Sequence, residues 1–175
     1  MKKILTPSFL IITALIAVAA VGRIFTPIPN FTPIAAIALF GAACFSRKSV
    51  AFLIPLVALA ATNLFLPRYD MITLVAVYGS FVLTGCIGLW LARKVSISRV
   101  ATAAVASSVL FFVLTNFAVW MSGFCGYPMT FGGLMLCYEM AIPFFRNELL
   151  GTLVYSGVLF GAFEFAKRRF PVLAQ

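Results

Sequence analysis

The hydrophobic and polar positions divide the chain into six apolar runs separated by short polar breaks. Most of these runs are close to the roughly 17–25 residues that a helix needs to cross a bilayer. The pattern therefore predicts an all-α membrane protein with six transmembrane helices in a single integral membrane domain, residues 1–175. The expected helices cover residues 7–23, 33–45, 50–66, 71–92, 100–121 and 143–165.

Proline and hydroxyl side chains indicate where three of these helices begin. Thr32 followed by Pro33 is typical of an N-cap and a first helical residue. Ser49 is the expected N-cap of the third helix, and Pro143 is the expected first residue of the sixth. Pro55 lies inside the third helix, where we expect it to produce a kink.

Two segments do not fit a plain spanning helix. The second helix would cover only about 20 Å, so residues 25–32 should enter the protein as extended chain. Irregular backbone at membrane depth is stable only where protein or a water-filled cavity satisfies its polar groups, which indicates a cavity here. Residues 123–141 are too glycine-rich for a regular helix and are expected to hold only a short turn around residues 134–140.

Composition supports the membrane assignment. The chain is 63% hydrophobic and only 10% charged, with a mean hydropathy of +1.13. Soluble domains average roughly 45–50% apolar and about 25% charged residues. The net charge of +9 is carried by short clusters between apolar runs. That arrangement is typical of membrane orientation and does not indicate a nucleic-acid surface.

The distribution of basic residues predicts the orientation. With the N-terminus inside, ten of the 13 lysines and arginines lie on the inner side, so both termini are expected in the cytoplasm. The protein is then a multi-pass protein of a bacterial cytoplasmic membrane. Near the inner end of the sixth helix, Glu164 can pair with Arg168 four residues later. The outer side carries Arg23, Arg68 and Arg146 together with the acidic residues Asp70, Glu139 and Glu148.

The N-terminal 22 residues have the charge pattern of a signal peptide, with two lysines before an apolar run. We interpret them as an uncleaved first helix, because their small residues are better explained as a packing face.

The residue types that most enzymes need are missing or dispersed. The chain has no histidine, no P-loop pattern and no aspartate-rich metal motif, so we expect neither an enzyme nor a bound cofactor or metal. Cys44 and Cys86 are expected to be small core residues. Cys125 and Cys137 lie on the outer side, and whether they are paired, free or ligand-binding stays open.

The segment 115–151 concentrates polar and ionisable groups between two apolar helices. Such groups are costly close to lipid and usually face a cavity or a partner, so this segment predicts one wall of a ligand site open to the outer side. A simple ion pair between Glu139 and Arg146 is the structural alternative. The candidate substrate-binding residues are Asn30, Asn116, Trp120, Tyr127, Tyr138, Glu139, Arg146, Asn147, Glu148 and Tyr155.

The fourth and fifth helices each carry a stripe of small or hydroxyl residues at helical spacing. We interpret these stripes mainly as packing faces, because small residues allow close approach and hydroxyls bond across helices. The stripes are Thr73, Val77, Ser80, Thr84 and Gly88 on the fourth helix, and Ser108, Phe112, Thr115, Val119 and Ser122 on the fifth.

Several short motifs occur in a familiar order. An alanine-rich first helix ends in Gly22-Arg23 and continues into TPIPNFTP, an alanine-rich second helix and the basic turn FSRK. The third helix LIPLVALAATNLFLP and the late motif IPFFRNELLG follow. With these motifs, the chain resembles the substrate-binding S components of energy-coupling-factor vitamin transporters. It is closest to a branch of small, uncharacterised bacterial membrane proteins with S-component-like features.

This resemblance implies an S-component-like bundle that captures a vitamin-like solute at its outer face. The implied binding loops are residues 25–32, 67–70 and 123–142. S components dock on a transmembrane coupling subunit driven by two ATPases, and here the implied docking residues are Ala14, Ala17 and Val18. Some S components work alone, including cobalamin carriers in which a cysteine approaches the cobalt.

The sequence therefore favours high-affinity binding and uptake of a small vitamin-like or micronutrient solute. A non-catalytic accessory or structural membrane subunit is the main alternative, and a solitary cobalamin-type carrier is a further one. A solute-binding protein should contain a preformed cavity near its outer polar residues, whereas a packing subunit should fill that space with its own side chains.

Overall fold

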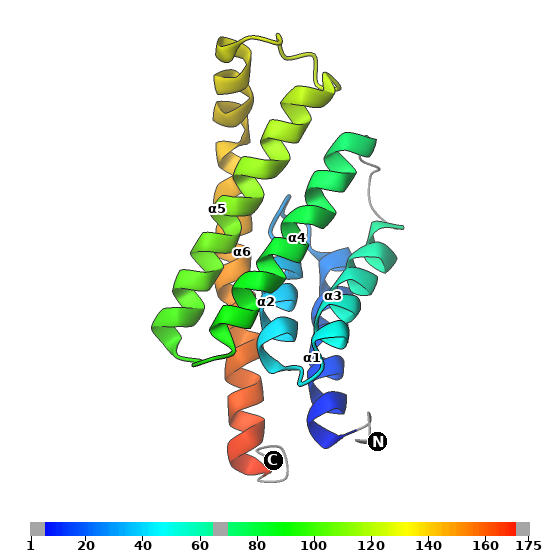
Figure 1. Cartoon of the computed structure of the whole chain (residues 1–175), viewed down its shortest axis with the longest axis vertical. Coiled ribbons are helices and arrows are strands. Elements are labelled where there is room, and N and C mark those ends of the chain that lie inside the picture. The colour runs from blue at the N-terminus through cyan, green and yellow to red at the C-terminus, as the bar shows by residue number, and fades with distance from the viewer. Residues whose placement is uncertain (1–5, 65–69, 171–175) are drawn as a thin grey trace.

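The computed structural model describes residues 6–64 and 70–170, and over these ranges the chain is entirely helical. Figure 1 shows the arrangement of the helices along the long axis of the molecule. The six helices of the described chain are α1 (Pro7–Phe25), α2 (Ile34–Cys44), α3 (Lys48–Asn63), α4 (Met71–Leu91), α5 (Ile97–Ser122) and α6 (Phe131–Arg169).

Helix α2 is the centre of the bundle and contacts each of the other five helices. Its sequence, IAAIALFGAAC, is apolar on every side, and residues 34–42 are all buried. A helix without a polar face is stable only when protein or lipid surrounds it. The remaining helices therefore pack around α2, with their outward faces free for lipid.

Close approach between α2 and its neighbours depends on small residues. A Cβ atom added at Gly88 of α4 would lie 2.7 Å from the Cβ of Ala42 and 2.8 Å from the carbonyl oxygen of Leu39. On the opposite side of α2, the ring of Phe40 meets Phe160 of α6 edge-on, with 5.2 Å between centroids. The end of the α4 stripe at Gly88 is therefore a packing face, as the sequence indicated.

Helices α4, α5 and α6 are long and apolar enough to cross a membrane. The three earlier helices are apolar but shorter, and the 11 residues of α2 cover only about 16 Å. Large apolar side chains such as Val75, Phe117 and Val158 are exposed on the three long helices, as expected of surfaces that face lipid. The structure thus supports a membrane protein with three clear candidate spans.

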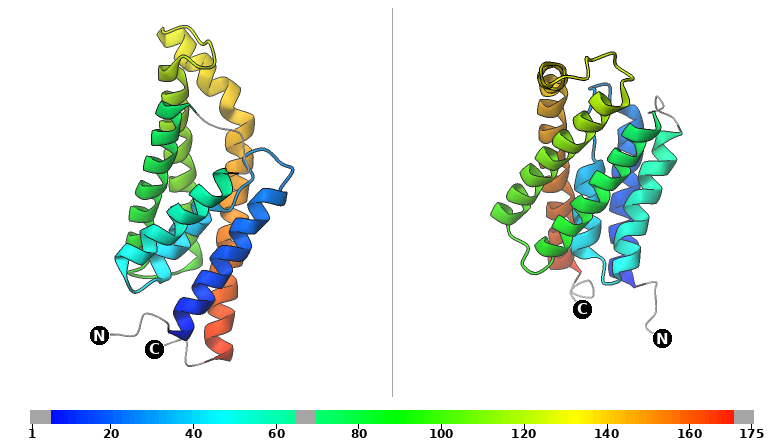
Figure 2. Two further views of the ribbon diagram at one scale, coloured as in Figure 1. Left: turned by 90° about the vertical axis from the view of Figure 1, so that its right-hand side faces the viewer. Right: turned by 45° about the horizontal axis from the view of Figure 1, so that its top comes forward.

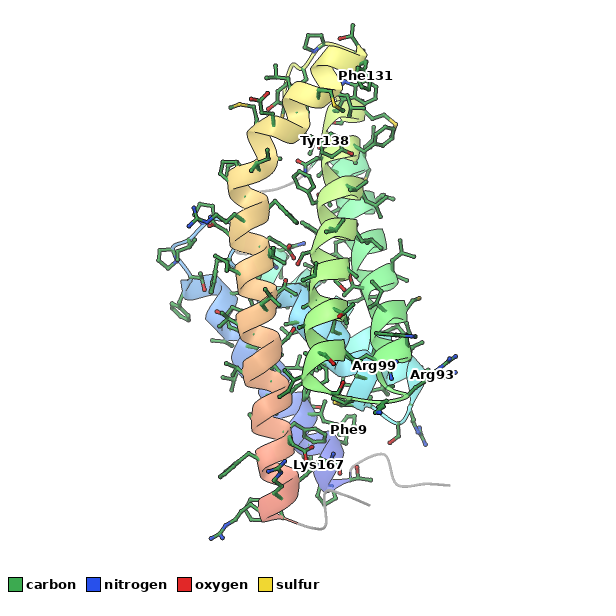
Figure 3. All side chains as sticks on the ribbon, turned by 90° about the vertical axis from the view of Figure 1, so that its left-hand side faces the viewer. Phe9, Arg93, Arg99, Phe131, Tyr138 and Lys167 are labelled. Atoms are coloured by element: carbon green, nitrogen blue, oxygen red, sulfur yellow. The ribbon has the colours of Figure 1, made fainter. Side chains whose placement is uncertain are left out.

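Helices α5 and α6 form a long antiparallel hairpin whose tip extends past the other helices, while the two ends of the chain lie at the opposite end (Figure 1). Three of the basic side chains, Arg93, Arg99 and Lys167, lie toward that same end, and Phe131 and Tyr138 lie near the hairpin tip (Figure 3). We call these the basic end and the hairpin tip. Three basic side chains thus gather toward one end of the long axis.

The predicted start of the sixth helix was wrong. Pro143 lies inside α6, a continuous helix of 39 residues that begins at Phe131. Proline removes one backbone hydrogen bond and bends a helix, but an apolar environment on both sides allows the helix to continue. The N-terminal part of α6 accordingly leans away from the axis of the rest (Figure 3).

The expected irregular segment is correspondingly shorter, residues 123–130. The hydroxyl of Thr130 accepts a hydrogen bond of 3.2 Å from the backbone N–H of Gly133 and so caps α6. Gly133 is needed because a Cβ there would collide with the carbonyl oxygen of Pro128. Gly133 therefore allows the preceding connection to lie directly against the start of α6, and it does not interrupt the helix.

Two further capping predictions were also wrong. Pro33 is the N-cap of α2 and makes no side-chain capping bond, so Thr32 precedes the cap. Ser49 is the second residue of α3, which begins at Lys48, and Pro55 lies inside that helix as expected. Residues 67–69 of the second implied binding loop lie outside the described residues.

Candidate functional site

A cavity of about 150 Å³ lies where α4, α5 and α6 meet the connection between α1 and α2. The stripes of α4 and α5 supply much of its wall, and α6 supplies an acidic side chain. Its lining residues are Asn30, Thr73, Val77, Phe111, Phe112, Thr115, Asn116, Val119, Ala141, Phe144, Phe145 and Glu148.

Glu148 is the ionisable residue of this lining and is only 6% exposed. Its Oε1 accepts a hydrogen bond of 2.9 Å from the hydroxyl of Thr152, one turn further along α6. Its Oε2 is buried and has no hydrogen-bond partner. Ser108 of α5 faces the same carboxyl group, but its hydroxyl also lacks a partner of good geometry. The carboxyl group therefore has an unused acceptor at the cavity.

The other polar groups of the lining also offer acceptors. The side-chain amide of Asn116 donates 2.8 Å to the carbonyl oxygen of Phe112, which leaves its own oxygen for a further bond. The hydroxyl of Thr115 is already used, because it donates 2.7 Å to the carbonyl of Phe111. The hydroxyl of Thr73 is buried and faces the carboxylate of Asp70, but it makes no hydrogen bond of good geometry.

Aromatic rings form the apolar part of the wall. Phe112 and Phe145 pack with 4.7 Å between ring centroids, and Phe112 also contacts Tyr138 at 5.4 Å. Phe111 packs on Phe81 of α4 at 5.2 Å. Three rings of the wall are therefore each supported by another ring.

The connection between α1 and α2 is fastened to α6 beside the cavity (Figure 2). The side-chain amide of Asn147 donates 3.1 Å to the carbonyl oxygen of Pro29, and Tyr155 packs on Phe31 with 5.7 Å between centroids. Asn30 adopts a left-handed backbone with φ of 60° and lines the cavity. The prediction that this segment enters the protein as extended chain was wrong: residues 27–30 are exposed, and the chain turns where the N–H of Phe31 donates 3.2 Å to the carbonyl oxygen of Ile28. Asn147 and Tyr155 hold this turn against the side of α6.

A family model matches residues 3–173, which is nearly the whole chain. The chain belongs to DUF6580. The family's own description is a family of unknown function. No curated protein and no solved structure matches this DUF6580 chain.

Three predicted site residues of the DUF6580 chain line the cavity, namely Asn30, Asn116 and Glu148. Trp120 and Tyr138 instead bind backbone near the hairpin tip. The indole N–H of Trp120 donates 2.9 Å to the carbonyl of Pro128, and the hydroxyl of Tyr138 donates 2.8 Å to the carbonyl of Val113. These two side chains therefore brace the hairpin. Tyr127 is half-buried in the 123–130 connection.

Glu139 and Arg146 are exposed on α6 and outside the cavity lining. They form no ion pair with each other, so the structural alternative raised from the sequence is wrong. The ion pairs of the described residues join Glu164 to Lys167 at 3.2 Å and to Arg168 at 3.5 Å. The predicted pairing of Glu164 with Arg168 is confirmed.

Sequence reasoning missed part of the aromatic wall, namely Phe111, Phe144 and Phe145. It did identify the stripes that contain Thr73, Val77, Phe112, Thr115 and Val119, but as packing faces. The sequence does not show which way each phenylalanine side chain points. The chain has 19 phenylalanines, and a ring that faces a cavity cannot be told from one that faces lipid by sequence alone.

The implied docking residues Ala14, Ala17 and Val18 are all exposed on α1, with Val18 74% exposed. The two outer cysteines are free thiols: Cys125 is exposed, while the buried Cys137 donates 3.4 Å to the carbonyl of Asn116.

A second, wider groove of about 510 Å³ involves the α2–α3 connection and the C-terminal part of α4. Its cations, Lys48 and Arg93, are exposed. The described part of this groove contains no buried polar atom that lacks a partner. The cavity at Glu148 is therefore the better candidate for a specific site.

Proposed function

We propose that this membrane protein binds a small solute in the cavity at Glu148 and takes part in its uptake across a bacterial cytoplasmic membrane. The observation that carries the proposal is a buried carboxyl group, that of Glu148, on a residue that lines the cavity and whose Oε2 makes no hydrogen bond of good geometry. A buried polar atom without a partner costs about 1–3 kcal/mol, and more when the group is charged. Binding of a solute would recover that cost.

The size of the cavity argues for a compact solute. A cavity of about 150 Å³ is large enough for a molecule of the size of benzene. A single-ring compound therefore suits the site, whereas a corrin ring would require extensive opening of the bundle. For this reason we favour a small micronutrient over a cobalamin-type ligand.

The topology that we propose has six membrane segments with both termini in the cytoplasm. Helices α4, α5 and α6 cross fully, and the shorter apolar helices α1, α2 and α3 complete the bundle. Support comes from the basic end, where Arg93, Arg99 and Lys167 lie toward the same end of the molecule as Phe9 of α1 (Figure 3). The hairpin tip then faces outward, as for a protein that captures its solute outside.

The relation to S components is part of this proposal. If the chain works with a coupling subunit and its ATPases, the exposed small face of α1 at Ala14 and Ala17 is where docking would occur. The alternative function, that of a packing subunit, would use the same face of α1 to contact a larger complex. It predicts that larger residues on α1 abolish assembly, while Glu148 can be changed without effect.

A ligand screen on the purified full-length protein tests the proposal. A solute that binds only the folded state should raise its stability by about 2.7 kcal/mol at a hundredfold excess over Kd. We expect at least one single-ring solute to raise the melting temperature, and Glu148→Gln to abolish both this shift and cellular uptake of that solute. If no solute shifts the melt, the packing-subunit reading is correct.

A further inference from the structure

The cavity lining contains a carboxyl group but no basic side chain. Glu148 is its ionisable lining residue, and none of the lining residues is a lysine or an arginine. Arg23 is the chain's buried arginine among the described residues, and its guanidinium donates 3.1 Å to the side-chain oxygen of Asn63, away from the cavity lining. The charge of an ionised Glu148 is therefore not balanced by the protein side chains that line the site.

The hydrogen-bonding groups of the cavity include several acceptors. Oε2 of Glu148 and the side-chain oxygen of Asn116 can accept, and the hydroxyl of Thr73 can accept as well as donate. A guest that brings several N–H donors satisfies all three. A protonated primary amine has three donors and no acceptor, so it matches this set.

The aromatic wall favours the same kind of guest. The faces of Phe111, Phe112 and Phe145 carry a negative electrostatic potential and attract a cation within about 6 Å of the ring centre. They also pack well against an aromatic or aliphatic ring. An anion would be repelled by the carboxylate of Glu148.

Resting on the proposed function, we infer that the solute of this site is a small organic cation, a protonated amine attached to a single ring or a skeleton of that size. The ammonium group binds between Glu148, Asn116 and Thr73, and the ring packs against the phenylalanines of α5 and α6. Specificity then comes from charge and size together: neutral analogues lack the ion pair, and larger amines exceed the cavity.

Three probes of almost equal shape test the inference: benzylamine, which is a cation at neutral pH, benzyl alcohol, which is neutral, and benzoate, which is an anion. Binding is measured by calorimetry and by thermal melting of the full-length protein in lipid nanodiscs. We expect benzylamine to bind about 10- to 100-fold more tightly than benzyl alcohol, because a hydrogen bond to a charged group contributes about 1.5–3 kcal/mol. Benzoate should not bind measurably.

Two variants connect this preference to named residues. Glu148→Gln keeps the shape of the side chain and should reduce the preference for benzylamine to less than about threefold. Thr73→Val removes a hydroxyl that faces the carboxylate of Asp70 but makes no hydrogen bond of good geometry, so the melting temperature without ligand should fall only slightly. It should weaken benzylamine binding about threefold to tenfold while leaving benzyl alcohol unchanged. Thr73→Val thus remains informative if Glu148→Gln fails to fold.

The outcomes separate the two proposals. If benzyl alcohol or benzoate binds as tightly as benzylamine, or if the preference for benzylamine survives in both variants, the cation inference is overturned and solute binding stands. If none of the three probes binds to the wild-type protein, a single-ring solute site is excluded and both proposals fail.

Discussion

The side-chain amide of Asn147 donates a hydrogen bond of 3.1 Å to the carbonyl oxygen of Pro29, 118 residues earlier in the chain. This bond fastens the connection between α1 and α2 to α6, immediately before the buried Glu148. Asn30, the next residue of the connection, lines the cavity. The bond therefore couples the position of one wall of the cavity to the helix that carries its carboxyl group.

Replacing Asn147 with leucine should loosen this wall. Loss of the hydrogen bond is expected to cost about 0.5–1.5 kcal/mol of stability and to weaken solute binding. Thermal melting and calorimetry with the best solute from the screen measure the two effects. Tyr155→Leu is a useful comparison, because it removes only the ring contact with Phe31. Unchanged affinity in the Asn147 variant would show that the wall is held by other contacts.

Gly151 allows the same connection to lie directly on α6. A Cβ atom there would lie 3.0 Å from the backbone nitrogen of Thr32 and 3.2 Å from the backbone of Phe31. Gly151→Ala should therefore push the connection outward, with a loss of about 1–3 kcal/mol and weaker binding. Gly157→Ala on the same helix is the matched control, since nothing lies within 4 Å of its added Cβ. Equal effects of the two substitutions would contradict this account.

Gly88 provides the corresponding test for the centre of the bundle. Its added Cβ would lie 2.8 Å from the carbonyl oxygen of Leu39, a backbone atom that cannot move without shifting α2. We expect Gly88→Ala to lower stability by about 1–3 kcal/mol, measured by denaturation in detergent. The control is Gly79→Ala on α4, where the added Cβ meets open space. A stable Gly88 variant would mean that α2 is less tightly enclosed than described.

Asp70 should contribute a pH-dependent part of the stability. It is the N-cap of α4, where its Oδ1 accepts 3.0 Å from the backbone N–H of Thr73, and hydrogen bonding with Thr73 lowers the pKa of its carboxyl group. Because the folded-state pKa is below the unfolded one, the stabilisation is present above about pH 4 and is lost as the pH falls through the lowered value.

The expected measurement compares Asp70→Asn with the wild type. The amide can still cap the helix, so the variant should lose little stability at pH 7 and should lack this part of the acid destabilisation. Asp70→Ala removes the cap and should cost about 0.5–2 kcal/mol at pH 7. Identical melting curves for wild type and Asp70→Asn between pH 5 and pH 3, to be recorded in about half-unit steps, would rule out this role.

Most helix interiors were predictable, because apolar runs of spanning length leave the chain few alternatives in lipid. The starts of α2, α3 and α6 were not. Pro143 is the clearest case: in water it is a strong start signal, whereas here the apolar residues on both sides of it keep the helix continuous. Its role was decided by the surroundings of the segment and not by local preference.

For the candidate site, polarity within an apolar chain was enough to select Glu148, Asn116 and Asn30. It was not enough to separate them from Trp120, Tyr138 and Asn147, whose polar atoms are used by backbone carbonyls. A polar side chain in lipid needs some partner, and the sequence does not reveal whether that partner is the chain itself or a guest.

The sequence by itself determined that this chain is helical and apolar, because these properties follow from composition and spacing alone. Only the tertiary structure decided that Glu148 keeps one oxygen unused and that Thr73, 75 residues earlier, faces the same cavity. The physical reason is that a cavity depends on how closely helices approach. That approach is set here by glycine contacts between segments far apart in the chain, such as Gly88 with α2 and Gly151 with the α1–α2 connection.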